Sequence, residues 1–516
     1  MTRRAAADLL IQIDERAGSG LQEQIYHCIR RAIVHGVLRA GARMTSSRAL
    51  AAELGVSRTT TQLVFEQLHA EGYLVARRGS GTFVAAELPD RRLRVPAPRA
   101  PSDLMQPILS RRGEALAGGA PSARRIPGPP RPFRIGVPAL ELFPVRLWAR
   151  LASRRVLSIT SSQLDYGAPG GLQALREAIA EHIGTARGTQ CDADQIYIVG
   201  SAQRGLDLVS RLLLDPGDRV LMEEPGYPGA WSALIGAGAS IVPVPVDQDG
   251  MQIDAVDGRA RGARMAYVTP SHQFPLGVPM SLARRLALLR WASAAGAWVV
   301  EDDYDSEFRH GAQPIPCLHG LDADGRVIYV GSFSKSVFPS LRLGFLIAPP
   351  ALRDRLLAAR RTAVDPLPPF LEQAVLADFM AGGHFARHLS RMRAAYRERL
   401  EALGDAAERY CGGALTLRPV RTGLHAVADL RDADAQRVFE EARARGVETM
   451  PLSAYMRGGG LAPSGLVLGF GAVSTDALAR GMRGLAAAIE AARGRRGRAM
   501  LSGDARRGES PSSASG

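Results

Sequence analysis

The sequence Val327-Ile328-Tyr329-Val330-Gly331-Ser332-Phe333-Ser334-Lys335 changes within a few residues from apolar side chains to two hydroxyls and an amine. The β-branched and aromatic residues at its start predict a buried β-strand. Ser332 and Ser334 stand directly before the lysine, and Arg342 follows it, so donors suited to a phosphate surround an amine. The stretch therefore predicts a strand whose carboxyl end holds an anion beside a reactive nitrogen.

Lys335 is the only lysine among the 65 basic residues of this 516-residue chain. Arginine stays protonated and cannot act as an amine nucleophile, whereas lysine can. A lysine is ordinarily a solvated surface residue. That explanation is weaker here, because every other basic position is arginine, so Lys335 is a candidate for amine chemistry.

Several further apolar runs alternate with segments of helical periodicity, which predicts an α/β fold with a mostly parallel sheet. In such sheets ligands bind outside the carboxyl ends of the strands. We expect strands at Gln195–Val199, Arg219–Met222, Arg264–Val268, Ala297–Val300 and Val327–Val330.

Two of the other strand ends also carry polar groups. Gly200-Ser201-Ala202-Gln203 leads into a predicted helix, whose free N–H groups suit an anion, although small residues are common in such turns. The strand ending at Val300 runs into four acids within 301–305, which suggests a metal cluster, a solvated loop or a carboxylate facing a cationic ring nitrogen. No histidine stands beside them at ligand spacing, so we expect no metal site.

A lysine able to form a Schiff base, a carboxylate for a pyridinium nitrogen and a phosphate-binding group together describe a pyridoxal-phosphate site. Each signal is weak alone. Their occurrence at the ends of successive predicted strands makes pyridoxal 5′-phosphate the expected cofactor.

The first part of the chain has a different pattern. Leu21, Ile25, Ile29, Ile33 and Val37 predict one helix over 21–38. A second is expected over 47–54, capped by Ser46 or Ser47 and ended by Gly55, and a third from Ser57 to about Gly72. A hairpin around 79–81 follows. This order is typical of a winged helix-turn-helix, with a generic three-helix bundle as the alternative.

The positive charge is concentrated outside the largest part of the chain. Residues 1–86 carry a net +4, residues 87–132 a net +5 with ten prolines, and residues 493–516 a net +4, which leaves +1 for residues 133–492. We therefore expect a DNA-binding domain, an extended Pro/Arg-rich linker, an α/β domain and a disordered basic tail over these ranges.

Other classes of protein are disfavoured by what the sequence lacks. No apolar run approaches the roughly 18 residues of a membrane-spanning helix, and the N-terminus has no signal-peptide pattern. The four cysteines are far apart, without CxxC spacing. We expect a cytoplasmic protein without a membrane partner.

About 65 residues at the start resemble the winged helix-turn-helix domain of GntR-type bacterial regulators. The resemblance rests on Thr45-Ser46-Ser47-Arg48-Ala49-Leu50-Ala51 and Gly79-Ser80-Gly81-Thr82-Phe83-Val84, with Thr45 where the family usually has proline. It implies double-stranded DNA as partner, contacted by Arg48, Ser57, Arg58, Thr59, Thr60, Arg77 and Arg78.

Residues 133–491 resemble fold-type I aminotransferases, through the lysine motif and through Tyr166-Gly167-Ala168-Pro169-Gly170, Pro225-Gly226-Tyr227 and Thr269-Pro270-Ser271-His272-Gln273-Phe274-Pro275. With its N-terminal domain, the whole chain resembles the MocR/GabR subfamily of GntR regulators.

The aminotransferase resemblance implies a role for each matching residue. It implies that Lys335 forms the internal aldimine, Asp302 pairs with the pyridinium nitrogen and Tyr304 lies near the cofactor O3′. Tyr227 would cover the ring, or is an ordinary core tyrosine, and Tyr166 would reach the phosphate of a partner subunit in a homodimer. The phosphate would be held by Ser201, Ala202, Gln203, Ser332, Ser334 and Arg342.

One departure concerns the arginine with which many aminotransferases bind a substrate carboxylate near the last strand. The corresponding stretch, Leu466-Val467-Leu468-Gly469-Phe470-Gly471, has none. Arg421 and Arg457 are candidates, and each is also explained as a solvated surface residue.

Two functions use the same cofactor site. In the first, a dimeric regulator binds paired DNA half-sites and senses an amino compound by aldimine exchange, with at most weak transamination. In the second, the chain is an active aminotransferase with an accessory DNA-binding domain; a cofactor-storing protein is a third. The N-terminal domain, linker and charge distribution favour the regulator.

Overall fold

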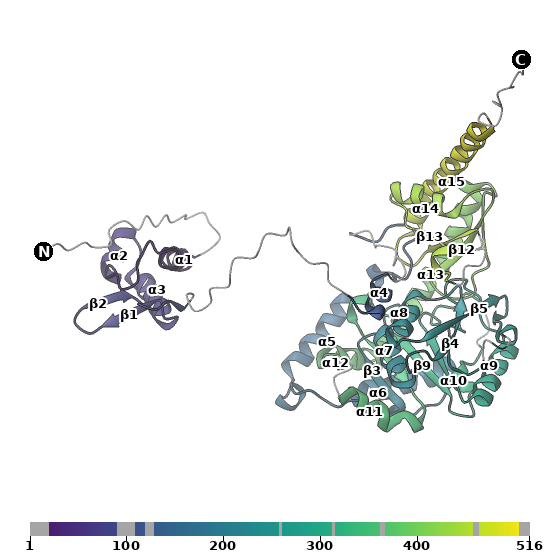
Figure 1. Ribbon diagram of the computed structural model, residues 1–516, viewed down its shortest axis with the longest axis horizontal. Coiled ribbons are helices and arrows are strands. Elements are labelled where there is room, and N and C mark those ends of the chain that lie inside the picture. Colours follow the sequence, from purple (N-terminus) through teal and green to yellow (C-terminus); the bar gives the residue numbers. More distant parts are fainter. Residues whose placement is uncertain are drawn as a thin grey trace, which may run out of the picture. The chain divides into compact units, whose positions relative to one another are not determined.

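The computed structural model describes residues 20–89, 109–118, 128–256, 258, 261–311, 315–361, 367–457 and 464–504, with side chains up to 493 (Figure 1). The chain divides between Pro107 and Ile108 into two compact units. Most of the expected linker over 87–132 and nearly all of the tail over 493–516 lie outside the residues whose side chains are described. No helix in the described part of the chain is long and apolar enough to span a bilayer.

The first unit contains three helices and a hairpin. Ile25, Ile29 and Ile33 pack against the third helix in a common core, as the helical spacing predicted. The first helix ends before Val37, which is 71% exposed, so this residue does not continue the buried stripe. The elements are α1 (Leu21–Val34), α2 (Ser47–Leu54), α3 (Arg58–Ala70), β1 (Leu74–Arg77) and β2 (Gly81–Val84).

Local hydrogen bonds define the turn between α2 and α3. The Ser46 hydroxyl accepts a hydrogen bond from the Ala49 N–H at 3.2 Å, so Ser46 rather than Ser47 is the N-cap of α2. Gly55 ends α2 with a φ of +68°, a conformation that favours glycine. Ser57 caps α3 by accepting from the Thr60 N–H. β1 and β2 are antiparallel, which completes a winged helix-turn-helix.

The second unit is built on an eight-stranded sheet with the order β3-β10-β9-β8-β7-β4-β5-β6. Five neighbouring strands from β9 to β5 are parallel, as predicted. β10 is antiparallel to both its neighbours, so β3 has the same direction as the parallel group. The strands are β3 (Ile196–Val199), β4 (Arg219–Glu224), β5 (Ser240–Asp247), β6 (Gly250–Met251), β7 (Ala263–Val268), β8 (Trp298–Asp303), β9 (Val327–Ser332) and β10 (Gly344–Ile347).

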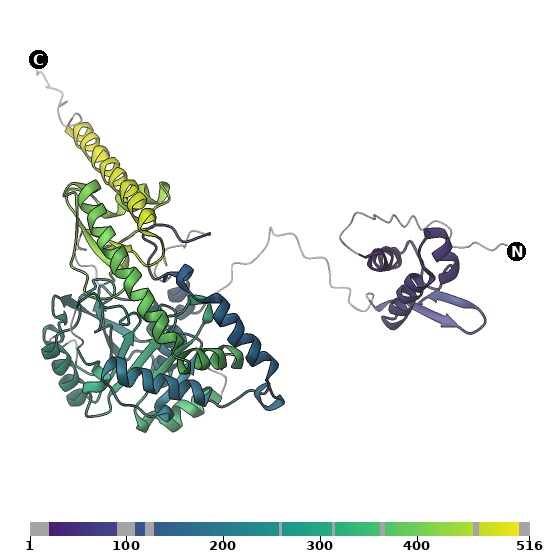
Figure 2. The ribbon, with the colours of Figure 1, turned by 180° about the vertical axis from the view of Figure 1, so that it is seen from behind.

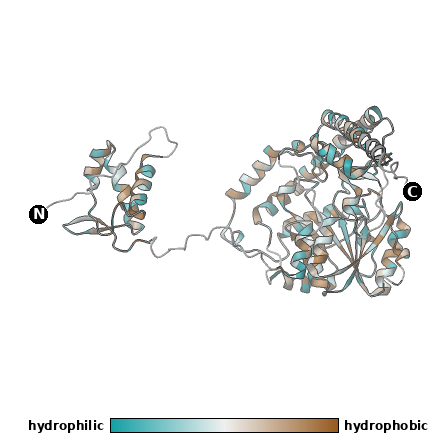
Figure 3. Ribbon diagram, turned by 45° about the horizontal axis from the view of Figure 1, so that its top comes forward, coloured by the Kyte–Doolittle hydropathy of each residue, from teal (hydrophilic) through white to brown (hydrophobic). Residues whose placement is uncertain are grey.

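Helices cover both faces of this sheet, whose central strands are mostly apolar (Figure 3). Leu206 and Leu234 of α7 and α8 pack on the face that includes Val300, and Leu288 of α9 packs on the face that includes Val299. The helices are α5 (Val145–Leu157), α6 (Gln173–Arg187), α7 (Ala202–Leu213), α8 (Pro228–Ala237), α9 (Leu282–Ala295), α10 (Leu318–Leu321), α11 (Arg353–Arg361) and α12 (Phe370–Ala381).

A smaller antiparallel sheet with the order β11-β12-β14-β13 follows in the chain. Two long helices, α13 and α15, pack against each other beside it (Figure 2). The elements are α13 (His384–Cys411), β11 (Leu415–Leu417), β12 (His425–Leu430), α14 (Ala435–Ala444), β13 (Met450–Pro451), β14 (Gly465–Gly469) and α15 (Thr475–Asp504).

One element departs from the extended linker that the sequence predicted. A short helix, α4 (Arg111–Ala117), forms within 87–132 and packs against α8. The ten prolines of this stretch leave residues 108–120 free of proline, so no proline in that window prevents a helical turn.

Candidate functional site

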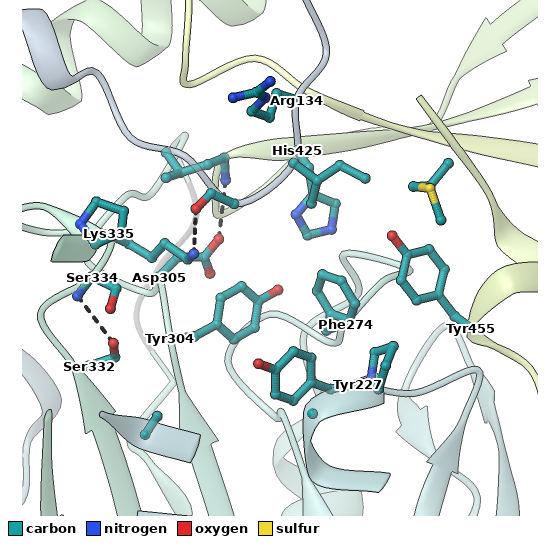
Figure 4. A pocket seen from close by; sticks show the side chains of 18 of the residues that line it. Arg134, Tyr227, Phe274, Tyr304, Asp305, Ser332, Ser334, Lys335, His425 and Tyr455 are labelled. Atoms are coloured by element: carbon teal, nitrogen blue, oxygen red, sulfur yellow. Dashed lines mark hydrogen bonds between the residues drawn. The ribbon is translucent and has the colours of Figure 1, made fainter. Parts of the chain in front are cut away.

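A cavity of about 560 Å³ opens at the carboxyl ends of β3, β4, β7, β8 and β9 (Figure 4). These five strands run in the same direction, so their carboxyl ends meet at the same edge of the sheet. The second sheet supplies the opposite wall, including His425 of β12. The cavity therefore lies where the α/β fold predicted a ligand.

Lys335 reaches this cavity from the loop after β9. Its ammonium Nζ donates a hydrogen bond to the carbonyl of Gly136, which lies between α4 and α5 in the chain. Gly136 has a φ of +74°, and a Cβ at this position would lie 3.0 Å from Nζ. The backbone conformation therefore favours glycine here, and a side chain at this position would displace the end of the lysine.

The four acids after Val300 are separated by their partners. Glu301 accepts hydrogen bonds from the N–H groups of Leu318 and His319 at 3.0 and 2.9 Å. Asp303 accepts from buried Arg187 at 2.8 Å and from the Tyr329 hydroxyl. Both lie on the face of β8 opposite Asp302. The acids of this stretch are therefore buried and divided between the two faces of β8, rather than exposed in a solvated loop.

Asp302 is the acid of β8 that lines the cavity. Its Oδ2 accepts a hydrogen bond from the Tyr267 hydroxyl at 2.7 Å, and its Oδ1 has no partner among the described residues. The side chain is buried, which raises its pKa to about 7. A buried carboxylate oxygen without a partner favours a cationic N–H group in the cavity, such as a protonated ring nitrogen.

The expected phosphate-binding residues line another part of the same cavity. Ser201 is the N-cap of α7, so Ala202 and Gln203 present the free N–H groups of that helix. Arg342 Nη2 lies 3.4 Å from the Ser201 hydroxyl. A helix N-terminus next to a guanidinium suits a dianion. The six predicted residues that line the cavity are Ser201, Ala202, Gln203, Ser332, Ser334 and Arg342.

Aromatic residues form a third part of the wall. Tyr227, at the start of α8, lines the cavity, which favours ring contact over the ordinary core position. Phe274 makes edge-to-face contacts with Tyr227, Tyr304 and Tyr455, with ring centroids 5.6, 5.9 and 5.1 Å apart. Such a wall suits a planar ligand.

Tyr304 belongs to a buried network that the sequence did not predict. Its hydroxyl lies 2.9 Å from His272 Nδ1, which also lies 2.9 Å from Asp305 Oδ1. The His425 ring lies 4.6 Å from the His272 ring at an angle of 34°, and burial lowers the pKa of His425 to about 3. His272, Asp305 and His425 are close enough to share an ion. His272 Nδ1 and His425 Nε2 have hydrogen-bond partners, whereas the buried His272 Nε2 has none among the described residues.

Some predicted residues do not meet the cavity. Tyr166 is 93% exposed and is absent from its wall. Arg421 is exposed, and Arg457 stacks on Trp231 at 5.2 Å; neither lines the cavity. Two arginines that sequence reasoning missed, Arg134 and Arg443, do.

Most of the predicted DNA-contacting residues are exposed on the first unit. Arg48 and Arg58 line one groove between α2 and the start of α3. Thr60 is half-buried and its hydroxyl bonds to that of Ser57, so these two groups stabilise the helix start. The Arg77 guanidinium lies over the Phe83 ring of the hairpin. The exposed set is Arg48, Ser57, Arg58, Thr59, Arg77 and Arg78.

Both units match known families. Residues 21–84 match bacterial regulatory proteins of the gntR family, and residues 135–458 match aminotransferase class I and II. The chain is 38% identical over 483 residues to the probable rhizopine catabolism regulatory protein MocR of Rhizobium meliloti, covering 93% of this chain and 96% of that protein. It is also 38% identical over 403 residues to the HTH-type transcriptional regulator TauR of Rhodobacter capsulatus, covering 75% and 81%.

A solved structure is similar to the second unit. LysN, an alpha-aminoadipate aminotransferase from Thermus thermophilus complexed with N-(5′-phosphopyridoxyl)-L-leucine, is 31% identical, covers 70% of this chain and 92% of its own, and gives a TM-score of 0.64. The order of the two domains agrees with the regulators over nearly the full length. This chain therefore belongs to the MocR subfamily of GntR-type transcriptional regulators, in which a winged helix-turn-helix precedes an aminotransferase class I and II domain.

Proposed function

We propose that this chain regulates transcription by binding DNA through its first unit and by sensing an amino compound at Lys335 in its second. The observation that supports the proposal is the presence of two candidate sites in one chain. One is a helix-turn-helix with exposed arginines, and the other is a cavity lined by Lys335, Asp302 and the residues expected to bind a phosphate.

The cavity residues fit pyridoxal 5′-phosphate. Asp302 Oδ1 would accept from the pyridinium nitrogen, the N-terminus of α7 and Arg342 would hold the phosphate, and Tyr304 and Tyr227 would contact the ring. When bound, the cofactor supplies an aldehyde carbon that forms a Schiff base with a primary amine. Lys335 supplies that amine within the chain, so a small amino compound competes with it for the same carbon.

We propose that the chain works as a homodimer on paired half-sites. Large apolar side chains gather on the surface between α5 and residue 166: Leu157 is 88% exposed, Leu164 71% and Tyr166 93%. A second copy would cover these residues and bring Tyr166 to the partner's phosphate. We expect Leu157→Asp to shift the protein from dimer to monomer in sedimentation. An unchanged dimer would place the interface elsewhere.

The test of the proposal measures cofactor attachment and DNA binding in one preparation. Wild-type protein should be yellow, and borohydride should fix the cofactor on Lys335. Lys335→Ala should lose all covalent attachment, because no second lysine exists. Both proteins should bind a DNA fragment selected from a random pool, and only the wild type should change its affinity on adding an amine. Stable label elsewhere in the chain would refute the assignment.

Transamination is the second candidate function. It is favoured by the completeness of the cavity and by the likeness to LysN. Multiple turnovers of an amino donor and a keto acid, without any effect of the donor on DNA affinity, would favour the enzyme. Weak or no turnover with a change in DNA affinity would favour the regulator.

A further inference from the structure

Between α4 and α5, the chain forms part of the wall of the cofactor cavity. We name residues 131–137 of this stretch the entry segment. Arg134, Ile135 and Gly136 of this segment line the cavity. The Gly136 carbonyl accepts the hydrogen bond from Lys335 Nζ, so the segment touches the reacting nitrogen itself.

The other side of the entry segment is fixed to the second sheet. The Pro132 carbonyl accepts from the Glu448 N–H at 3.0 Å, and the Phe133 carbonyl accepts from the Gly469 N–H of β14 at 3.0 Å. Arg134 makes two hydrogen bonds with the Glu448 carboxylate, the longer at 2.9 Å.

Close packing reinforces these bonds. Phe133 is fully buried with a φ of +66°, so its backbone is held in a conformation that a non-glycine residue rarely adopts. A Cβ on Gly469 would lie 2.2 Å from the Arg134 carbonyl oxygen, and one on Gly481 of α15 would lie 2.4 Å from Pro132 Cβ. A shift of the segment must therefore move with the second sheet and α15.

We propose that the entry segment reports the chemical state of Lys335 to the rest of the chain, through the bond between Nζ and the Gly136 carbonyl. This inference rests on the proposed function. A free lysine ammonium has three N–H groups that can rotate to reach the Gly136 carbonyl, whereas a nitrogen joined to the cofactor by a C=N bond would have at most one, and the double bond would fix its direction. When an incoming primary amine takes over the cofactor carbon, the C=N bond to Nζ breaks and one to the amine forms. The two hydrogens of the amine end on Nζ, which can again donate to Gly136.

The first test follows amide hydrogen exchange of residues 131–137. In cofactor-free protein, Lys335→Ala should speed exchange of this segment about fivefold, the size expected for one lost hydrogen bond. Lys335→Arg, which keeps a cationic donor but cannot form the C=N bond, should stay close to wild type. In cofactor-loaded wild type, hydroxylamine should slow exchange by a similar factor, because it releases the lysine. Equal exchange in all these samples would overturn the proposal.

The second test uses two glycines with the same backbone conformation. Gly136 and Gly296 have φ of +74° and +62°, but a Cβ at 296 would meet nothing within 4 Å. Gly136→Ala should reduce the hydroxylamine-induced change in DNA affinity at least threefold, and Gly296→Ala should leave it as in wild type. A full response in Gly136→Ala would refute the proposal.

The two tests separate this inference from the proposed function. If hydroxylamine does not change the DNA affinity of the wild type, the proposed regulatory function is wrong. The hydrogen-exchange measurement still shows whether the entry segment responds to the state of Lys335. It also tests the proposal if Gly136→Ala does not fold.

Discussion

Asp302 and Asp303 are neighbours in sequence with opposite surroundings. Asp302 faces the cavity and keeps one oxygen without a partner among the described residues. Asp303 faces the other side of β8, where it pairs with buried Arg187 and accepts from Tyr329. The two surroundings differ because successive side chains of a strand point to opposite faces of the sheet. Substitutions of the two acids should therefore affect different properties of the protein.

The first prediction uses this pair. Asp302→Asn should weaken cofactor retention about 10- to 100-fold, since a charge-assisted hydrogen bond contributes about 1.5–3 kcal/mol. Asp303→Asn should retain the cofactor but lower the free energy of unfolding by about 3 kcal/mol, because it leaves the Arg187 charge with less compensation. Cofactor titration and chemical denaturation measure the two effects. The reverse pattern would show that Asp303 holds the pyridinium nitrogen.

The second prediction concerns Glu223, a fully buried residue of β4. Its Oε2 accepts from the N–H and hydroxyl of Thr269, while its Oε1 has no partner among the described residues. Burial raises its pKa from 4.5 to about 7. The folded state thus binds the proton more tightly than the unfolded state, and the resulting stability is lost as pH rises from about 4.5 through 7.

Glu223→Gln removes this titration and keeps the oxygen that Thr269 needs. At pH 4.5 the free energy of unfolding of the variant should be nearly that of wild type. At pH 8 it should exceed the wild-type value by up to about 3 kcal/mol. Chemical denaturation of cofactor-free protein at both pH values measures the difference. A difference independent of pH would show that Glu223 is ionised throughout.

Single residues could be predicted from the sequence where the chemistry lies within one short motif. Lys335 and the acids after Val300 are of this kind. Tyr267, His272 and Arg134 escaped prediction, because each acts on a residue far away in sequence. No spacing rule joins Tyr267 to Asp302, or Arg134 to Glu448; only the parallel strands and the second sheet bring them together.

At the scale of elements, the turn between α2 and α3 carries the surface that we predict to contact DNA. The sequence left two serines as possible caps of α2, and the structure assigns Ser46. Ser46→Ala should lower the stability of α2 by about 1 kcal/mol, whereas Ser47→Ala should lower it by far less. Hydrogen exchange of the α2 amides in the full chain measures this as about fivefold faster exchange for Ser46→Ala. Equal effects of the two changes would contradict the assignment.

Elements were predictable where a long apolar run or a capping residue marks them. The five predicted strands of the large sheet all form, each within a few residues of its expected ends. β10 was missed because its four residues follow the lysine loop without a periodic signal. α4 was missed because proline content was averaged over the whole connecting stretch.

At the scale of the whole molecule, the excess positive charge lies outside residues 133–492. Arg58→Ala should reduce DNA affinity and make the slope of log affinity against log salt shallower by about 0.9 if one phosphate contact is lost. Loss of a base contact should instead weaken the selected sequence by about 1–3 kcal/mol. Visible absorbance of the bound cofactor should not change. If the substitution leaves DNA affinity unchanged, the result would favour the aminotransferase as the function of the chain.

The alternation of side chains along β8 limits insertions and deletions within this strand. An insertion of one residue between Trp298 and Glu301 would present Glu301 to the cavity in place of Asp302, and a deletion of one residue would present Asp303. An indel of two residues would restore the face but displace the acid along the strand by about 6.6 Å. The number of residues in this strand before Asp302 should therefore be constrained, even at positions where single substitutions are tolerated.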